Sequence, residues 1–353
     1  MFHLLAVSFT ILFLCFRQYT LILQTFRDGL HHIPISIRRF ALASSWILPV
    51  ALNRLILYVG TSPIGSENQW IQRIKKSTWE GVWIGPNLNS LKQAEEIALN
   101  QDVILFYIHG GGFSMGHATM YMQSFQLIIQ TLYKVYGKKA SILSLEYSLS
   151  PEQVWPKACY ESMDGYRYLI HELRIEPSKV IFIGDSAGGN LVASTLLMLK
   201  DKRSNERLKE LVHLPLPAGA ALISPWIDLT KIQAIRQSDT LSPNLLSQCL
   251  SQYLSDQSMI HHPYVSPFYG DFSSLTCPLF ISYGEHELLR TSIELFISNL
   301  KESGNNPTVL KGENESHIWL IFSIMATSRQ VYDKDINALA KWITGKVVNF
   351  EPK

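Results

Sequence analysis

The stretch Gly184-Asp185-Ser186-Ala187-Gly188 constrains the fold more than any other part of the chain. It has the form Gly-x-Ser-x-Gly, with an apolar run at residues 181–183 before it and an apolar helical pattern at residues 190–200 after it. A serine fits on a tight turn between a strand and a helix only if the residues two before and two after it lack side chains. The pattern therefore predicts a nucleophile elbow, in which Ser186 is exposed and the next helix turns its first amides toward it.

Length and charge exclude several classes of protein. A chain of 353 residues can form one large domain. Its net charge is only +2 and its Lys and Arg are scattered, which argues against a nucleic-acid surface or a polyanionic substrate. The four cysteines are far apart and include no Cys-x-x-Cys, so neither a zinc-finger pattern nor a disulfide framework is indicated.

The first residues are apolar. Residues 4–16 carry no charge, and after a short polar interruption the chain is apolar again at residues 19–23. No small-x-small cleavage site comes after them, so we expect residues 1–24 to be an uncleaved, single-pass signal anchor, with a cleaved signal or a peripheral amphipathic segment as alternatives. Four arginines between residues 17 and 39 favour a cytoplasmic position for the main domain.

A second apolar stretch, residues 40–60, is interrupted by Pro49, Asn53 and Arg54. We interpret it as a helix of a cap, with a second membrane segment as the alternative. Residues 25–353 are then expected to form one catalytic domain. Its cap segments are expected at about residues 25–75 and 230–262.

Strand and helix patterns alternate along the rest of the chain. Strands are expected at residues 79–84, 103–108, 142–145, 181–183, 220–223, 279–283 and 308–310. Helices are expected at residues 123–136, 158–171, 190–200 and 318–322. This alternation predicts an α/β fold, a mostly parallel sheet with helices on both faces, and places functional sites at the carboxyl ends of the strands.

Three consecutive glycines come directly after the expected strand at residues 103–108, in the stretch His109-Gly110-Gly111-Gly112. Such a run costs conformational entropy unless the backbone itself has a task. We expect it to present amides to an oxyanion, the alternative being an ordinary flexible loop. His109 precedes the serine and is expected to make structural hydrogen bonds.

Ser186 requires a base, because a serine hydroxyl is a poor nucleophile at neutral pH. In proteins with an elbow of this form, the acid and then the histidine lie on loops after later strands. His317, in a polar loop after the last expected strand, is the expected base. Candidate acids are Glu287, Glu285, Asp228 and Asp271. The histidines at positions 31, 32, 261, 262 and 286 are expected to lie on the surface or in the cap.

Taken together, five motifs resemble the hormone-sensitive-lipase-like branch of the α/β hydrolases over residues 104–322. They are His109-Gly110-Gly111-Gly112, Tyr147-Ser148-Leu149-Ser150-Pro151-Glu152, the elbow, Ser224-Pro225-Trp226-Ile227-Asp228-Leu229 and Pro263-Tyr264-Val265-Ser266-Pro267. That family has the acid in a Glu-x-Asp-x-Leu segment, with which Glu285-His286-Glu287-Leu288-Leu289 aligns. The resemblance therefore favours Glu287, a glutamate where aspartate is usual. The chain also departs from the family at Ser148, where members often have a structural arginine.

The resemblance implies an α/β-hydrolase fold with a helical cap and a Ser-His-acid triad. Its residues are Ser186, Glu287 and His317, with oxyanion amides from Gly111, Gly112 and Ala187 and motif-supporting residues His109, Gly110, Gly184, Asp185 and Gly188. The activity implied is hydrolysis of short-acyl esters of hydrophobic alcohols through an acyl-enzyme. No metal or organic cofactor is required. Alternatives are a lipase acting on longer acylglycerols, an amidase, and an inactive relative that binds small molecules.

Together with the N-terminal apolar segment, the motifs resemble membrane-anchored arylacetamide deacetylases and fungal steryl acetyl hydrolases. This likeness implies the endoplasmic reticulum membrane, and acetylated sterols as candidate substrates. It also implies a catalytic domain in the lumen, whereas the arginines favour the cytoplasm, so the membrane side stays open. The sequon at Asn314 adjoins His317 and is expected to be unused. The oligomeric state cannot be inferred from the sequence.

Overall fold

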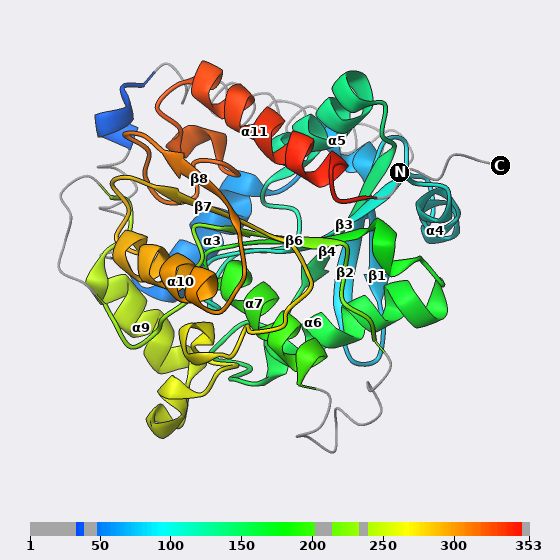
Figure 1. Ribbon diagram of the computed structural model, residues 1–353. Coiled ribbons are helices and arrows are strands. Elements are labelled where there is room, and N and C mark those ends of the chain that lie inside the picture. Colours follow the sequence, from blue (N-terminus) through cyan, green and yellow to red (C-terminus); the bar gives the residue numbers. More distant parts are fainter. Residues whose placement is uncertain (1–32, 39–47, 202–213, 233–238, 348–353) are drawn as a thin grey trace, which may run out of the picture.

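The computed structural model describes residues 33–38, 48–201, 214–232 and 239–347. One eight-stranded sheet runs through the middle of the molecule (Figure 1). In chain order its strands are β1 (Ile71–Lys75), β2 (Glu80–Ile84), β3 (Val103–Ile108), β4 (Ala140–Glu146), β5 (Val180–Asp185), β6 (Gly219–Ile223), β7 (Leu279–Gly284) and β8 (Thr308–Gly312).

The strands lie in the order β1-β2-β4-β3-β5-β6-β7-β8. β2 pairs antiparallel with β1 and β4, and all pairs from β4 to β8 are parallel. The predicted mostly parallel sheet is therefore confirmed. Strand β1 is absent from the sequence prediction, and it occupies the last residues of the first expected cap segment.

Helices cover both faces of the sheet. They are α3 (Val50–Thr61), α4 (Leu91–Leu99), α5 (Met122–Tyr136), α6 (Lys157–Arg167), α7 (Ala187–Lys200), α9 (Pro243–Tyr253), α10 (Arg290–Glu302) and α11 (Arg329–Thr344). Helices α5 and α11 pack together on one face, and α6, α7 and α10 lie on the other (Figure 1).

The central strand β3 shows why the sheet is covered on both sides. All six of its side chains are buried, and they point alternately to the two faces. Ile104, Phe106 and Ile108 enter the core under α6 and α7, whereas Leu105 and Tyr107 enter the core under α5 and α11. A continuous apolar run is the pattern expected of a strand buried on both faces.

Residues 318–322 differ from the prediction. The sequence predicts a helix after His317, but these residues form a turn in which the amides of Ile321 and Phe322 donate to the carbonyl of Ile318. Ile318 has a φ of 53°. A residue with this φ cannot lie within a right-handed helix, so Ile318 does not belong to the helix expected at residues 318–322.

The described part of the second apolar stretch is α3, which begins after Pro49. Its Arg54 guanidinium donates to the carbonyls of Ser114 and Ser150 and pairs with the Glu152 carboxylate at 2.8 Å, which fixes the helix to the loops after β3 and β4. No helix in the described ranges is long and apolar enough to cross a membrane. The anchor expected at residues 1–24 lies outside those ranges.

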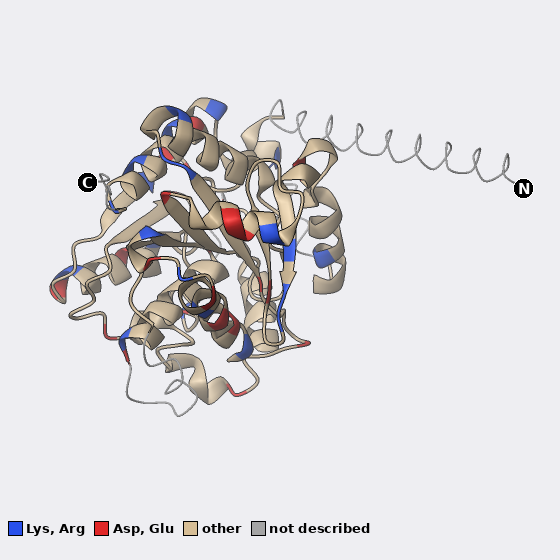
Figure 2. Cartoon of the chain, turned by 90° about the vertical axis from the view of Figure 1, so that its right-hand side faces the viewer, with Lys and Arg blue, Asp and Glu red and all other residues tan. Residues whose placement is uncertain are grey.

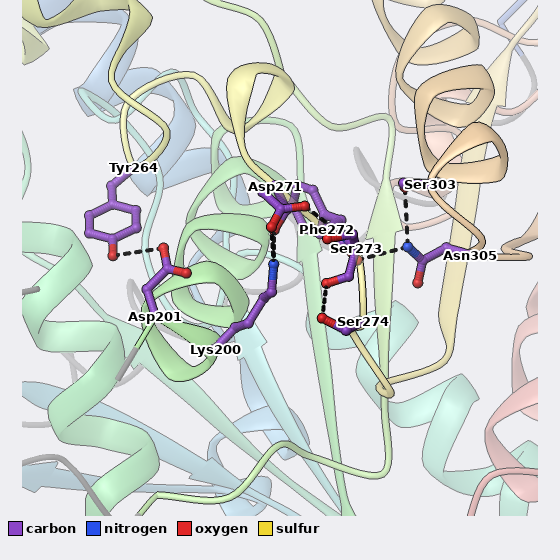
Figure 3. Close-up of polar contacts among 9 residues, drawn as sticks. All are labelled: Lys200, Asp201, Tyr264, Asp271, Phe272, Ser273, Ser274, Ser303 and Asn305. Atoms are coloured by element: carbon purple, nitrogen blue, oxygen red, sulfur yellow. Dashed lines mark hydrogen bonds and ion pairs between the residues drawn. The ribbon is translucent and has the colours of Figure 1, made fainter. Parts of the chain in front are cut away.

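Charges are spread over the surface. On the side shown in Figure 2, acidic and basic residues are interspersed. Ion pairs and hydrogen bonds fix surface loops to one another. At the end of α7, for example, Lys200 donates to the carbonyl and carboxylate of Asp271 at 2.6 Å, and Asn305 donates to the carbonyl of Phe272 at 2.8 Å (Figure 3).

Candidate active site

Ser186 sits on a sharp turn between β5 and α7. Its φ of 51° and ψ of −116° are strained for a residue with a side chain. A Cβ on Gly184 would lie 2.4 Å from the carbonyl oxygen of Gly188, and a Cβ on Gly188 would lie 2.0 Å from the carbonyl oxygen of Ile108. Both distances are far below van der Waals contact, which is why both positions are glycine.

The glycine loop after β3 lies beside this turn. Gly111 and Gly112 have φ values of 108° and 61°, and both line the same cavity as Ser186. Ala187 is the first residue of α7, so its amide has no acceptor within the helix. The structure thus brings together the three residues expected to supply oxyanion donors.

Asp185 holds the glycine loop against the elbow. Its buried carboxylate accepts hydrogen bonds from the Tyr107 hydroxyl at 2.6 Å, the Tyr121 hydroxyl at 2.7 Å and the Gly110 amide at 3.0 Å. Burial raises the pKa of this carboxyl, although the three donors oppose the shift. A Cβ on Gly110 would lie 2.3 Å from the same carboxylate, so the fit also requires glycine here.

His109 is fully buried and takes a structural position. Its ring stacks on Tyr147 at 4.2 Å, its Nδ1 contacts the Gly110 carbonyl at 2.8 Å, and the Tyr147 hydroxyl donates to the His109 carbonyl. Burial lowers the pKa of His109 to about 4, despite the opposing hydrogen bond to Gly110. The ring is therefore neutral at physiological pH.

His317 and Glu287 extend from the loops after β8 and β7. The distance from His317 Nδ1 to Glu287 Oε2 is 3.9 Å, which is longer than a hydrogen bond. Catalytic hydrogen bonds are often long in the absence of substrate. Both side chains are buried, and His317 lines the cavity together with Ser186.

Ser224, after β6, links these two loops. Its hydroxyl donates to Glu287 Oε2 at 2.7 Å and accepts from the Ile318 amide at 3.2 Å. The Gly284 amide also donates to Glu287 Oε2, at 3.0 Å. The acid is therefore oriented by two donors on neighbouring strands.

The surroundings of His317 favour its charged form. Burial, the largest single effect, would lower its pKa, but Glu287 and, to a smaller extent, Asp239 and Asp185 together outweigh burial and raise the pKa above its usual value. Charge on the imidazole is thus stabilised in the way that a base taking a proton from serine requires.

The other three acids considered for the triad interact with other residues. Glu285 pairs with Lys311 at 3.2 Å, Asp271 pairs with Lys200, and Asp228 accepts from the amide and hydroxyl of Thr230. Among the alternative histidines, His261 packs on Tyr269, and His262 packs on Trp155 and Tyr264. His31 and His32 lie outside the described residues.

The cavity above Ser186 is mostly apolar. Its empty space, including the part open to solvent, is about 760 Å³. Helix α3 contributes Leu57 and Thr61, and α9 contributes Leu245, Leu246 and Cys249. These helices come from the two expected cap segments.

Sequence reasoning assigned no role to several residues of this site. They are Tyr107, Tyr121, Ser224, Asp239 and the residues of α9 that line the cavity. Ser224 lies in one of the five family motifs, which is a usable signal. Asp239 lies in a segment without a recognisable pattern.

Several known proteins are similar to this chain in sequence. An acetyl-hydrolase of Streptomyces hygroscopicus is 29% identical over 219 residues, which are 61% of this chain and 67% of that protein. An esterase of Acinetobacter venetianus is 29% identical over 191 residues, 53% of this chain and 57% of that protein. The putative steryl acetyl hydrolase mug81 of Schizosaccharomyces pombe is 31% identical over 144 residues, 40% of this chain and 35% of that protein. The chain thus spans between 35% and 67% of the length of these relatives.

Solved structures share the fold. An esterase/lipase from an uncultured bacterium has a TM-score of 0.72 at 21% identity and covers 89% of this chain and 99% of its own. A hormone-sensitive lipase from a metagenome library has a TM-score of 0.69 at 20% identity and covers 90% and 99%. The α/β-hydrolase fold that the motifs imply is thereby confirmed. The sequence pattern of the α/β hydrolase fold family matches residues 105–321, more than half of the chain, and the protein belongs to that family.

Proposed function

We propose that the protein is a serine carboxylic ester hydrolase that acts on short-acyl esters of hydrophobic alcohols. The observation that carries the proposal is the arrangement around one cavity. A strained serine, a buried histidine beside a buried carboxylate, and a glycine loop all meet there. The names of the relatives, acetyl-hydrolase and esterase, agree with this activity.

The positions of these groups determine the reaction. His317 takes the proton from Ser186 as its Oγ attacks the ester carbonyl, and Glu287 stabilises the imidazolium that forms. The amides of Gly111, Gly112 and Ala187 stabilise the oxyanion. His317 then protonates the departing alcohol, and water attacks the acyl-enzyme by the same steps in reverse order.

The cavity supports the substrate class. Side chains from both cap helices and from the turn after His317 give it an apolar lining. An apolar alcohol gains free energy by leaving water for such a pocket. Acetylated sterols belong to this class, and the match to a putative steryl acetyl hydrolase makes them the first natural substrates to test.

Hydrolysis of p-nitrophenyl esters from acetate to palmitate tests the proposal. Ser186→Ala should lower kcat by at least about 10⁴-fold. Ser194→Ala is the matched control, because Ser194 is also buried on α7 but bonds to Asn190 and the Tyr264 carbonyl. A preference for palmitate over acetate would favour the lipase alternative. Equal rates for the wild type and Ser186→Ala would favour an inactive small-molecule binder.

We also propose that residues 1–24 anchor the protein in the endoplasmic reticulum membrane. The support is the uncharged run at residues 4–16. Full-length protein should resist carbonate extraction from microsomes, whereas a variant lacking residues 1–24 should be released. Protease protection of the intact microsomes would then give the side on which the catalytic domain lies. Release of the full-length protein by carbonate would contradict the anchor.

A further inference from the structure

Asp239 is a buried carboxylate that has no part in the acyl-transfer steps. It precedes α9, within the second cap segment, and its residue is only 5% exposed. Burying a carboxylate costs free energy unless it is hydrogen-bonded or paired. The hydrogen-bond partners of Asp239 therefore indicate the role of its carboxylate.

The hydrogen bonds of Asp239 join the two catalytic loops. Oδ2 accepts from the amide of Leu288, the residue after the acid Glu287. Oδ1 accepts from the amide of His317 itself, at 3.4 Å. One side chain of the cap thus holds the backbones of both the acid and the base. Ser224 links the same loops from the side of the sheet.

A local role alone does not explain this geometry. Asp239 Oδ1 also accepts from the amide of the next residue, Thr240, at 2.7 Å. Asp228 stabilises a turn in the same way through Thr230, at 2.9 Å. Asp239 differs because it also accepts from loops 49 and 78 residues away. A turn needs neither of those contacts.

The charge of Asp239 acts on His317 as well. Three carboxylates raise the pKa of this imidazole against the effect of burial, namely Glu287 after β7, Asp239 before α9 and Asp185 in the elbow. Glu287 is the nearest acid, and Asp185 is occupied by its three donors. Asp239 is the one of the three that the cap supplies.

We infer that Asp239 is a positioning residue for the catalytic histidine and acid, through which the cap segment fixes the two loops and adds a second negative charge beside His317. The inference rests on the proposed triad. If Asp239 has this role, the rate of the chemical step depends on a cap residue that is not part of the cavity lining.

Two substitutions remove the charge and break the hydrogen bonds to different extents, because the amide nitrogen of an asparagine cannot accept from the Leu288 or His317 amide. Asp239→Asn keeps one carbonyl acceptor and removes the charge, whereas Asp239→Ala removes both. We expect Asp239→Asn to lower kcat about tenfold at unchanged KM and to shift the acid limb of kcat/KM down by about one pH unit, since one pKa unit corresponds to a tenfold effect. Asp239→Ala should lose more activity. It should also speed amide hydrogen exchange at Leu288 and His317.

A readout without turnover separates this inference from the proposed function. In protein carrying ¹³C-labelled histidine, the His317 signal, identified by its loss in His317→Gln, should titrate at lower pH in Asp239→Asn than in the wild type. Asp228→Asn is the matched control and should leave both kcat and this titration unchanged. If the His317 titration and kcat of Asp239→Asn coincide with those of the wild type, the inference is wrong. If no ester is hydrolysed but the titration shifts, the proposed function fails and the coupling of Asp239 to His317 stands.

Discussion

Replacing Glu287 by glutamine isolates the charge of the proposed acid. Glu287 Oε2 accepts from the Ser224 hydroxyl and the Gly284 amide. The carbonyl oxygen of a glutamine can accept both hydrogen bonds, so the loop and the size of the side chain are preserved. The substitution removes only the negative charge that faces His317.

The distance between the two groups sets the expected effect. At 3.9 Å between His317 Nδ1 and Glu287 Oε2, Coulomb's law with an effective dielectric constant of about 20 gives an attraction of about 4 kcal/mol for the imidazolium. At pH values above the pKa of His317, the imidazolium exists in the transition state but not in the resting enzyme. The loss therefore appears in the barrier, and kcat should fall about 10³-fold.

The assay is hydrolysis of p-nitrophenyl acetate, with circular dichroism and thermal unfolding to show that the variant is folded. Glu285→Gln is the matched control, because Glu285 is the neighbouring acid and bonds to Lys311 and the Asn314 amide instead. It should keep the wild-type kcat. The reasoning is refuted if folded Glu287→Gln keeps more than about a tenth of the wild-type kcat, or if Glu285→Gln loses as much activity.

The same geometry supports two further predictions. The pKa of His317 is raised, and the imidazole must be neutral to accept a proton. We therefore expect kcat/KM to rise with pH through a value above the ordinary histidine pKa of about 6.5. A pH–rate profile whose acid limb lies below that value would contradict this prediction. Gly188→Ala should lower the urea midpoint of unfolding sharply or prevent folding, because its Cβ would lie 2.0 Å from the Ile108 carbonyl oxygen. Gly60→Ala should unfold close to the wild-type midpoint, because outside its own helix no atom of the described residues lies within 4 Å of the added Cβ.

The sheet could be predicted from the sequence because most of its strands are continuous apolar runs. β3 and β5 are buried on both faces, and a run of apolar residues is sufficient to locate them. The edge strand β1 mixes Gln72, Arg73 and Lys75 with isoleucines, and only one of its residues is buried. Such a strand carries little signal in a single sequence.

The elbow and the glycine loop could be predicted for a different reason. Their glycines are required by close contacts with neighbouring atoms, as the Cβ positions at Gly184, Gly188 and Gly110 show. A requirement of this kind leaves a motif of fixed spacing. The positive φ of Ile318 is not marked by any such motif, and the sequence alone did not indicate it. The helix expected there was therefore wrong.

Asp239 could not be predicted, because its partners are remote in the sequence. The amides it binds belong to Leu288 and His317, and no spacing along the chain indicates that they meet. The same holds for Arg54, which reaches the carbonyls of Ser114 and Ser150 from α3. Contacts of this kind are fixed by how the cap sits on the sheet.

Because some contacts of the site are remote in the sequence, similarity to a family accounts for only part of the site. The family match covers residues 105–321, which include the serine, the acid, the histidine and the glycine loop. Helix α3 precedes the matched region, yet its Leu57 and Thr61 line the cavity in which a substrate would lie. Part of the cavity wall is therefore built from sequence that the family pattern does not describe. The proposed reaction and the proposed choice of alcohol therefore depend on different parts of the chain.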